Sequence, residues 1–549
     1  MTGIPRAILA IDAGAATTAV AILGRPADRW RLIGSLVGPA PASPDDLAAV
    51  LAGRIRAADP GLAKAIGLDP AAIDDLPRLE ARSAPPVALA VLAASRRAVG
   101  LLHGVAERTS WRVVVASPES HDPREMTDLA LRPEVGAILV GATEPPGPDE
   151  RAAIDDVAGL VAAVLRRRPE LRAVVAGPIA TRRAWADALG DEAEQAAARI
   201  MEAPPLGPRS GPDDALREIL EGLLPGATDT RHTAMRSLAS LADVLDRRIE
   251  LVDIGLDGGL RAVAVPGVAE EGPTVEGVRS ASGALVPPDP DEAAVEQVLA
   301  WTTGSLDRHR MGDRLRDLRS RPWADATGEG ARLRLAAARA AMTRLVNVTP
   351  DLSVLPAPDL TLVAGGAFAA APGGSVVLAV ADVVRRTGAT QVALDHARLL
   401  GPLGTIDDPD ERRDLVADIA DDLLSPLGSL VIAAGMPPRL RGRAATGTIT
   451  LDPEDGTAAI AATARRELAT GELAILDLAP GERASATLVF RDSARIGRRA
   501  RRFSVSVSGG LAGVMVDLRD VPLRLPERRD RRRAALATWG EQVWPGDER

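Results

Sequence analysis

The sequence has no cysteine and no tyrosine, and aromatic residues make up only 2% of its 549 residues. The lack of cysteine excludes disulfides, thiol nucleophiles and thiolate metal sites. Because aromatic residues are so few, a hydrophobic core has to be built mainly from alanine, leucine, valine and isoleucine. Lysine is nearly absent as well: Lys64 is the only one, so arginine carries almost all of the positive charge.

The formal net charge is −9 and the sequence pI is about 5.4, which argues against a general binder of nucleic acid or of an anionic membrane. No apolar run approaches the ~18 residues that a membrane-spanning helix needs. The first residues, Met-Thr-Gly-Ile-Pro-Arg, lack the layout of a signal peptide. These features predict a cytoplasmic protein with neither nucleic acid nor membrane among its partners.

A chain of this length is too long for one hydrophobic core. Strand and helix patterns alternate along it, as at 87–93, 95–110 and 111–116, and this alternation predicts an α/β fold with a mostly parallel sheet. We predict a first subdomain with helical insertions at 1–247, a second subdomain at 248–436, and a β-rich C-terminal domain at 437–549 that ends in an arginine-rich helix.

Two similar hairpin patterns organise the chain. Residues 251–264 place an Asp253-Ile-Gly255 turn between two apolar runs, and residues 7–24 do the same around Asp12-Ala-Gly14. An Asp-x-Gly sequence alone is most often just a turn. Two such hairpins, each opening one half of an α/β chain, suggest a duplicated fold. Their backbone amides would then face a nucleotide bound between the halves.

Six short blocks follow one another in order between residues 7 and 405. They are Asp12-Ala-Gly14-Ala-Ala-Thr-Thr18, Ile138-Leu-Val-Gly141-Ala-Thr143, Asp253-Ile-Gly255, Thr274-Val-Glu-Gly277, Gly365-Gly366 and Leu394-Asp395. In these blocks the sequence resembles the glutamate mutase L (MutL-type) family, the accessory ATPase of coenzyme-B12-dependent glutamate mutase. The resemblance implies duplicated ribonuclease-H-like subdomains of the actin/Hsp70/sugar-kinase type with a nucleotide cleft. The β-rich tail lies outside it.

The resemblance also implies a binding site, cofactors and a partner. The nucleotide-binding residues would be Asp12, Gly14, Thr17, Thr18, Asp253, Gly255, Gly258, Gly365 and Gly366. The ligand would be ATP or ADP with Mg²⁺, which Asp12 and Asp253 would hold through water. The partner would be a B12-dependent mutase that the protein helps to assemble or reactivate, without binding cobalamin itself.

The sequence departs from the family pattern in both phosphate turns. Ala15, Ala16 and Ala19 replace the Ser, Thr and Lys of the first turn. Gly258, Gly259 and Leu260 replace the two Thr and the final Asp of the second. These changes remove hydroxyls and a charge that phosphoryl transfer uses. We therefore expect nucleotide binding rather than brisk hydrolysis: at most a weak ATPase, with a pseudo-ATPase as an open alternative.

Two further hypotheses remain open: a non-catalytic scaffold that binds a protein partner through its tail, and a small-molecule kinase of the same fold. No catalytic residue is identified, and the oligomeric state is not predicted. Glu276 is either a functional acid or the opening of a helix. The Asp307-x-His309-x-x-Gly312 pattern is interpreted as a coincidental match to a cobalt-ligating motif. The arginine runs at 498–502 and 528–533 are interpreted as solvated surface.

Overall fold

The structure is a computed structural model. It describes residues 6–544 except for 41, 69–72, 84, 144–145, 178, 180, 184, 186, 188–198, 205–213, 225–228, 269–270, 324–326, 370, 436–445 and 455–463. The chain divides into two compact units. Unit 1 contains residues 1–84, 227–277 and 283–549, and unit 2 contains residues 85–226 and 278–282. Each unit is described below by itself.

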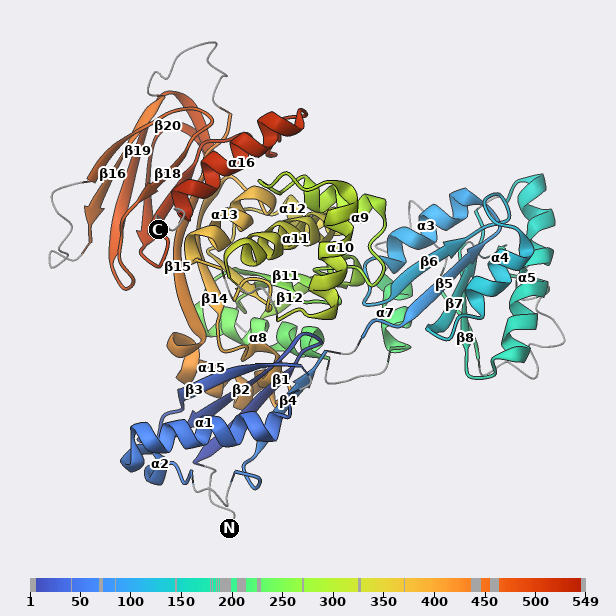
Figure 1. The fold of residues 1–549 in the computed structure, drawn as a ribbon, viewed down its shortest axis with the longest axis horizontal. Helices are drawn as coiled ribbons and strands as arrows, with labels where there is room; N and C mark the ends of the chain where they lie inside the picture. The colour runs from blue at the N-terminus through green and yellow to red at the C-terminus, as the bar shows by residue number, and fades with distance from the viewer. Residues whose placement is uncertain are drawn as a thin grey trace. The chain divides into compact units, whose positions relative to one another are not determined.

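The first sheet of unit 1 has four strands in the order β3-β2-β1-β4 (Figure 1). Its strands are β1 (Ala7–Ala13), β2 (Thr17–Gly24), β3 (Arg31–Pro39) and β4 (Arg78–Arg82). The first three form an antiparallel meander, and β4 lies parallel to β1. Helices α1 (Pro44–Ala58) and α2 (Pro60–Ala65) follow the meander. Leu51 and Ile55 of α1 pack on Leu9 and Ile11 of β1, because these apolar side chains share one buried face.

The second sheet of unit 1 has eight strands in the order β12-β11-β10-β13-β14-β15-β21-β18. The strands are β10 (Ile249–Ile254), β11 (Gly259–Val265), β12 (Thr274–Ser280), β13 (Leu360–Ala364), β14 (Gly388–Asp395), β15 (Leu424–Ile432), β18 (Leu473–Leu476) and β21 (Val514–Asp517). Strands β10, β13 and β14 are mutually parallel, whereas β11 and β15 run antiparallel to their neighbours β10 and β14.

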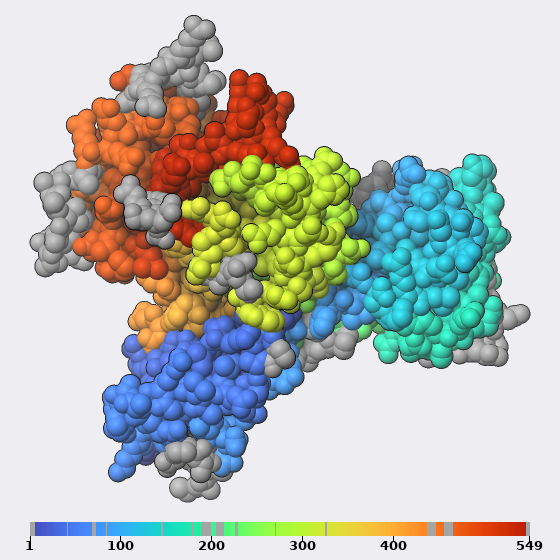
Figure 2. Space-filling model, viewed as in Figure 1, coloured from blue at the N-terminus to red at the C-terminus, as the bar shows by residue number. Residues whose placement is uncertain are grey.

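Helices cover both faces of this second sheet. On one face lie α8 (Thr230–Leu245), α14 (Leu400–Leu403) and α15 (Pro409–Leu423), and on the other lie α9 (Glu292–Leu299), α10 (Arg308–Ser320), α11 (Gly328–Asn347), α12 (Pro350–Ser353) and α13 (Gly373–Val383). The core around α8 also contains residues of β1 and β2, so this layer joins the two sheets. The amides of Trp30 and Leu32 donate to Asp418 and Asp422 of α15. Figure 2 shows the blue N-terminal residues against the orange ones of this region.

The tail of the chain continues the second sheet as well as forming a sheet of its own. Strands β16 (Gly447–Pro453), β17 (Ala464–Leu468), β19 (Arg483–Ile496) and β20 (Arg498–Ser508) make an antiparallel sheet in the order β17-β16-β19-β20. Strand β21, however, pairs in parallel with β15, and β18 pairs with β21. The tail is therefore β-rich and ends in a helix, α16 (Arg529–Val543), as the sequence predicts, but part of it belongs to the second sheet.

Unit 2 has one five-stranded parallel sheet in the order β6-β5-β7-β8-β9. Its strands are β5 (Ala88–Ala93), β6 (Arg112–Ala116), β7 (Val135–Gly141), β8 (Arg172–Ala176) and β9 (Ile200–Glu202), and its helices include α3 (Arg96–Ala106), α4 (Pro123–Ala130), α5 (Pro148–Arg167) and α7 (Asp214–Gly222). The parallel sheet predicted for this stretch is present. It forms a unit with its own two hydrophobic clusters, whereas the sequence analysis placed it inside one subdomain at 1–247.

The strand order repeats within unit 1. In both sheets a three-stranded meander is extended on the side of its first strand by a parallel strand: β3-β2-β1-β4 in the first sheet and β12-β11-β10-β13-β14 in the second. This is the duplicated, ribonuclease-H-like α/β arrangement of actin/Hsp70-type ATPases, and it confirms the predicted fold class. No helix in the described residues is both long and apolar enough to cross a membrane.

Candidate functional site

The two Asp-Gly turns occupy equivalent places in the two halves of unit 1. Asp12 lies opposite Ala19 at the end of β1, and Asp253 lies opposite Leu260 at the end of β10. Each turn is closed by a backbone hydrogen bond, from Gly14 N to Thr17 O at 3.0 Å and from Gly255 N to Gly258 O at 2.9 Å. Both turns line one cleft, which encloses a cavity of about 80 Å³. The predicted meeting of the two hairpins is therefore found in the structure.

The glycine pair after β13 lines the same cleft. Gly365 has φ of +96°, a backbone conformation that side-chain-bearing residues rarely adopt. A Cβ atom there would lie 2.6 Å from Oδ1 of Asp253 and would also collide with the carbonyl of Ile254. A Cβ atom on Gly366 would lie 2.9 Å from the Arg398 guanidinium. Glycine is thus required at 365, where the chain approaches Asp253 and the Ile254 backbone, whereas Gly366 lies directly against the movable guanidinium of Arg398.

Asp395 adds a third carboxylate that the sequence analysis noted only as part of a Leu-Asp block. It ends β14, and its two oxygens accept hydrogen bonds from the amides of Leu399 at 3.0 Å and Leu400 at 3.1 Å. Thr230, at the start of α8, donates its hydroxyl to Asp12 at 3.1 Å. Asp229 caps this helix by accepting from the amide of His232, which fixes the position of Thr230.

Enclosure by protein changes the acidity of these carboxyl groups. Loss of hydration raises the pKa of Asp12 to about 6, against the lowering effect of the nearby Arg398 charge. Burial likewise raises the pKa of Asp395 to about 6, although it accepts two backbone hydrogen bonds. Burial also raises the pKa of Asp253, against the charges of Arg231 and Arg398. Three acids that resist ionisation in one cleft are typical of a functional site.

Two arginines that the sequence analysis missed lie against the phosphate turns. Arg398 donates from Nη1 to the hydroxyl of Thr17 at 2.5 Å. Arg231, whose side chain is almost fully buried, donates from Nη2 to the carbonyl of Gly258 at 3.0 Å. Among 66 basic residues, no sequence signal separates these two from the rest. Each turn therefore carries a guanidinium group in place of the missing lysine and hydroxyls.

The sequence-predicted residues divide into two groups. Asp12, Gly14, Thr17, Asp253, Gly255, Gly365 and Gly366 line the cleft, whereas Thr18 and Gly258 are not among its lining residues. Thr18 is buried on β2, and Gly258 contributes its carbonyl to the second turn. Within the described residues, no group of three or more His, Asp or Glu side chains is placed to hold a metal ion directly.

Three other sequence patterns lie away from the cleft. Asp307 caps helix α10 by accepting from the amide of Arg310 at 2.8 Å, and His309 is exposed. This agrees with a coincidental motif match. Glu276 lies on strand β12 with its side chain exposed, so the helix-opening alternative is wrong and a role in the cleft has no support. Arg498, Arg499, Arg501 and Arg502 are exposed on β20, as expected for a solvated surface.

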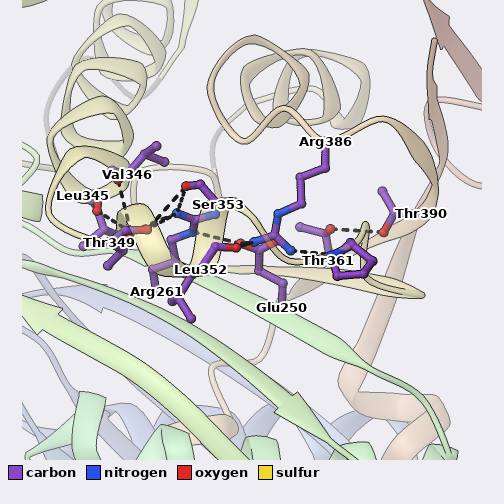
Figure 3. Close-up of polar contacts among 11 residues, drawn as sticks. Glu250, Arg261, Leu345, Val346, Thr349, Leu352, Ser353, Thr361, Arg386 and Thr390 are labelled. Atoms are coloured by element: carbon purple, nitrogen blue, oxygen red, sulfur yellow. Dashed lines mark hydrogen bonds and ion pairs between the residues drawn. The ribbon is translucent and has the colours of Figure 1, made fainter. Parts of the chain in front are cut away.

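A buried charge network lies beside the strand that carries Asp253 (Figure 3). Oε1 of Glu250 on β10 accepts from Arg261 and from Arg386, each at 2.9 Å. Arg261 also donates to the hydroxyls of Thr349 and Ser353 at the end of α11 and in α12. The two cations offset the charge of a glutamate with no exposed area, and the network ties β10 and β11 to the helices above them.

At the carboxyl edge of the unit 2 sheet, where open α/β sheets commonly bind ligands, a buried glutamate occupies the space next to β5 and β7. Glu150 of α5 accepts from Ser95 Oγ at 2.9 Å, from Thr143 N at 2.8 Å and from Thr143 Oγ1. Burial opposes the charge, but these hydrogen bonds outweigh it and lower the pKa of Glu150. The cleft of unit 1 is therefore the stronger candidate site.

No protein-family model and no curated protein matches the sequence. Solved structures are similar in fold. Component A of (R)-2-hydroxyglutaryl-CoA dehydratase from Acidaminococcus fermentans is 9% identical, covering 74% of this chain and 98% of its own, with a TM-score of 0.27. Ethanolamine utilization protein EutJ from Carboxydothermus hydrogenoformans is 11% identical, covering 73% and 89%, with a TM-score of 0.22. A reductive activator for a corrinoid, iron-sulfur protein is 11% identical, covering 76% and 63%, with a TM-score of 0.21. At these scores the similarity carries no functional argument.

Proposed function

We propose that this protein is an accessory protein of the actin/Hsp70-type fold whose unit 1 cleft binds the phosphate tail of ATP or ADP. The observation that carries this proposal is the convergence of the Asp12 and Asp253 turns with the Gly365-Gly366 pair on one cleft. Glycine turns let the backbone approach a phosphate closely, and guanidinium groups bind phosphate oxygens in a bidentate manner. Arg231 and Arg398 supply such groups at the two turns.

Hydrolysis in this cleft is proposed to be slow or absent. Phosphoryl transfer depends on charge placed around the transferred group and on a positioned water. Ala15, Ala16 and Ala19 contribute no polar side-chain atom to the first turn. The amides of Gly14 and Gly255 already donate to carbonyls within their own turns. The protein therefore acts by binding, as a switch between open and closed forms, when ATP and ADP favour these forms to different extents.

The proposed partner is another protein. The resemblance to the glutamate mutase L family supports a B12-dependent mutase, which this chain would help to assemble or reactivate without binding cobalamin itself. The second candidate function is a nucleotide-free scaffold. The observation that favours it is that Arg398 and Arg231 already form hydrogen bonds to Thr17 and Gly258, two of the predicted nucleotide-binding residues.

Thermal unfolding with and without nucleotide tests the proposal. A ligand at 100 times its dissociation constant adds about 2.7 kcal/mol to the free energy of unfolding, so ATP or ADP should raise the melting temperature clearly. Ala16→Trp, which places a bulky side chain in the cleft, should abolish the shift. Asp421→Ala, which removes an exposed carboxylate from α15 outside the cleft, should keep it. No shift for the unmodified chain at millimolar nucleotide would overturn nucleotide binding and leave the scaffold function.

A further inference from the structure

Arg398 lies at the electrostatic centre of the cleft. Although burial is the larger effect and raises the pKa of each acid, the positive charge of Arg398 acts on all three carboxylates, Asp12, Asp253 and Asp395. It is also hydrogen-bonded to Thr17 of the first turn and lies against Gly366. In a metal-dependent nucleotide site, this position between carboxylates and phosphate turn belongs to the cation.

The backbone holds Arg398 in place. Its φ is +54°, in the left-handed region that residues with a Cβ adopt only a few per cent of the time. The amides of the next two residues, Leu399 and Leu400, both donate to Asp395. These bonds clamp the loop on either side of the strained residue and direct its side chain into the cleft. Such strain persists where the surrounding contacts over-determine a conformation, and it is concentrated at functional sites.

Arg231 provides a second cation at the other turn. Only 6% of this residue is exposed, and it lines the cleft. A Cβ atom on Gly255 would lie 2.8 Å from its Nη2, so the guanidinium is packed directly on the turn. Its Nε is buried and has no hydrogen-bond partner among the described residues. A buried donor without a partner carries a desolvation cost, so this guanidinium is held in the cleft with hydrogen-bonding capacity to spare.

This arrangement does not fit Mg²⁺. The ion requires oxygen ligands in near-ideal octahedral geometry and usually keeps several waters. Here a guanidinium shares the cleft with the carboxylates and repels a dication. The charges of Arg398 and Arg231 also oppose part of the negative charge of the cleft carboxylates. A guanidinium offers fixed, planar donors to a phosphate, so it can take over both the charge and the contacts of the ion.

We propose that Arg398, assisted by Arg231, takes the place of the divalent cation, so that the cleft recognises the phosphate tail of a nucleotide without metal. This inference rests on the proposed nucleotide-binding function and specifies its chemistry. It assigns Arg398 as the residue that determines metal independence.

The first test measures ADP binding to the full chain by calorimetry, in EDTA and in excess Mg²⁺. The dissociation constants should agree within about twofold. Arg398→Gln should weaken binding in EDTA at least tenfold, and Mg²⁺ should restore part of it because the carboxylates then lack their cation. Arg413→Gln is the matched control: it removes an exposed guanidinium that pairs with Asp243 on the surface, and it should change neither constant.

The second test uses Mn²⁺ alone, followed by electron paramagnetic resonance, and needs no nucleotide. The unmodified chain should leave Mn²⁺ free at millimolar concentrations, and Arg398→Gln should bind it. ADP binding that EDTA abolishes, or tight Mn²⁺ binding by the unmodified chain, overturns the metal-free proposal while leaving nucleotide binding intact. Absence of ADP binding under both conditions overturns the proposed function instead, and the Mn²⁺ result on the unmodified chain still decides the role of Arg398.

Discussion

Arg398 and Thr17 are 381 positions apart in the sequence, yet the guanidinium of one donates to the hydroxyl of the other at 2.5 Å. Thr17 begins β2 in the first half of unit 1, whereas Arg398 follows β14 in the second half. The hydrogen bond therefore links the two halves across the cleft. A ligand that binds to Thr17 or Arg398 has to break or share this hydrogen bond. Variants of either residue therefore report on how the two halves are coupled across the cleft.

Removing the hydroxyl should weaken this link. We expect Thr17→Val to lower the free energy of unfolding by about 1.5–3 kcal/mol, the usual contribution of a hydrogen bond to a charged group. Urea unfolding measures this change. Thr18→Val, one residue further along β2, is the matched comparison because Thr18 does not line the cleft. Equal losses for the two variants would contradict a specific contribution from the bond to Arg398.

Stability should depend on pH through Asp12. Its pKa is raised from 3.8 to about 6 in the folded chain, so between these values the folded state holds a proton that the unfolded chain has lost. The free energy of unfolding therefore falls as the pH rises through this window. Asp12→Asn, which cannot ionise, should be more stable than the unmodified chain at pH 7.5 by at most about 3 kcal/mol.

This advantage of Asp12→Asn should shrink as the pH falls from 6 towards 4, since Asp12 is then protonated in the unmodified chain too. Urea unfolding of both proteins at pH 4.5 and pH 7.5 measures the difference. An advantage that stays the same at the two pH values would show that ionisation of Asp12 is not its cause.

The Glu250 network should contribute strongly to the free energy of unfolding. Glu250→Ala leaves the guanidinium groups of Arg261 and Arg386 buried without their shared anion (Figure 3). Breaking a buried ion pair in this way typically costs about 3–5 kcal/mol. We expect a loss of that size in urea unfolding. Glu296→Ala, which removes one of the two glutamates that pair with the exposed Arg308, should change little and controls for loss of a glutamate. A small loss at Glu250 would mean that water reaches the network.

Asp517 should stabilise the fold as much as Glu250 does, because its two ion pairs hold β21, the last strand, in place. Arg385 and Arg519 both pair with it, at 2.5 Å and 2.6 Å. Burial opposes its charge, but these arginines outweigh that effect and hold the pKa of Asp517 below its usual value. Its stabilising contribution is present above the pKa of an unfolded aspartate and is lost in stronger acid.

We therefore expect Asp517→Ala to cost about 3–5 kcal/mol near neutral pH, again because it leaves buried charges unpaired. Asp520→Ala, three residues along the chain and exposed, is the control and should be nearly neutral. Thermal unfolding of both variants measures these changes in stability. If the tail were a separate domain, Asp517→Ala would leave the melting of the rest of unit 1 unchanged, contrary to this expectation.

Features that depend only on neighbouring residues were predicted correctly from the sequence. The Asp12 and Asp253 turns are formed by neighbouring residues, so their sequences alone predict hairpins at the right places. The β-rich character of the tail was also predicted, because alternation of apolar residues is a local signal. Which strands pair is not local: nothing near residues 514–517 indicates that they lie beside β15. The boundary predicted at residue 437 therefore divides the chain within a sheet.

The arginines of the cleft were missed for a related reason. Arg398 acquires its role from a left-handed backbone angle and from contacts with residues far away in sequence. Arg231 lies one residue after the start of α8, where an arginine in an amphipathic helix usually indicates an exposed face. The departures from the family turns, such as Ala15 and Ala19, did predict an altered cleft, but not which groups replace the lost ones.

The pairing of β21 with β15 also governs how the chain is completed during synthesis. Strand β15 ends at Ile432, but its neighbour β21 begins only at Val514, so one edge of the second sheet stays uncovered until residues 433–513 and then β21 have been synthesised. An open edge of this kind can recruit strands from other nascent chains. Pro426 and Gly428 interrupt the apolar run of β15. They limit the apolar, uncovered part of that edge to Ser429–Ile432, and a short stretch is less prone to pair with a foreign strand.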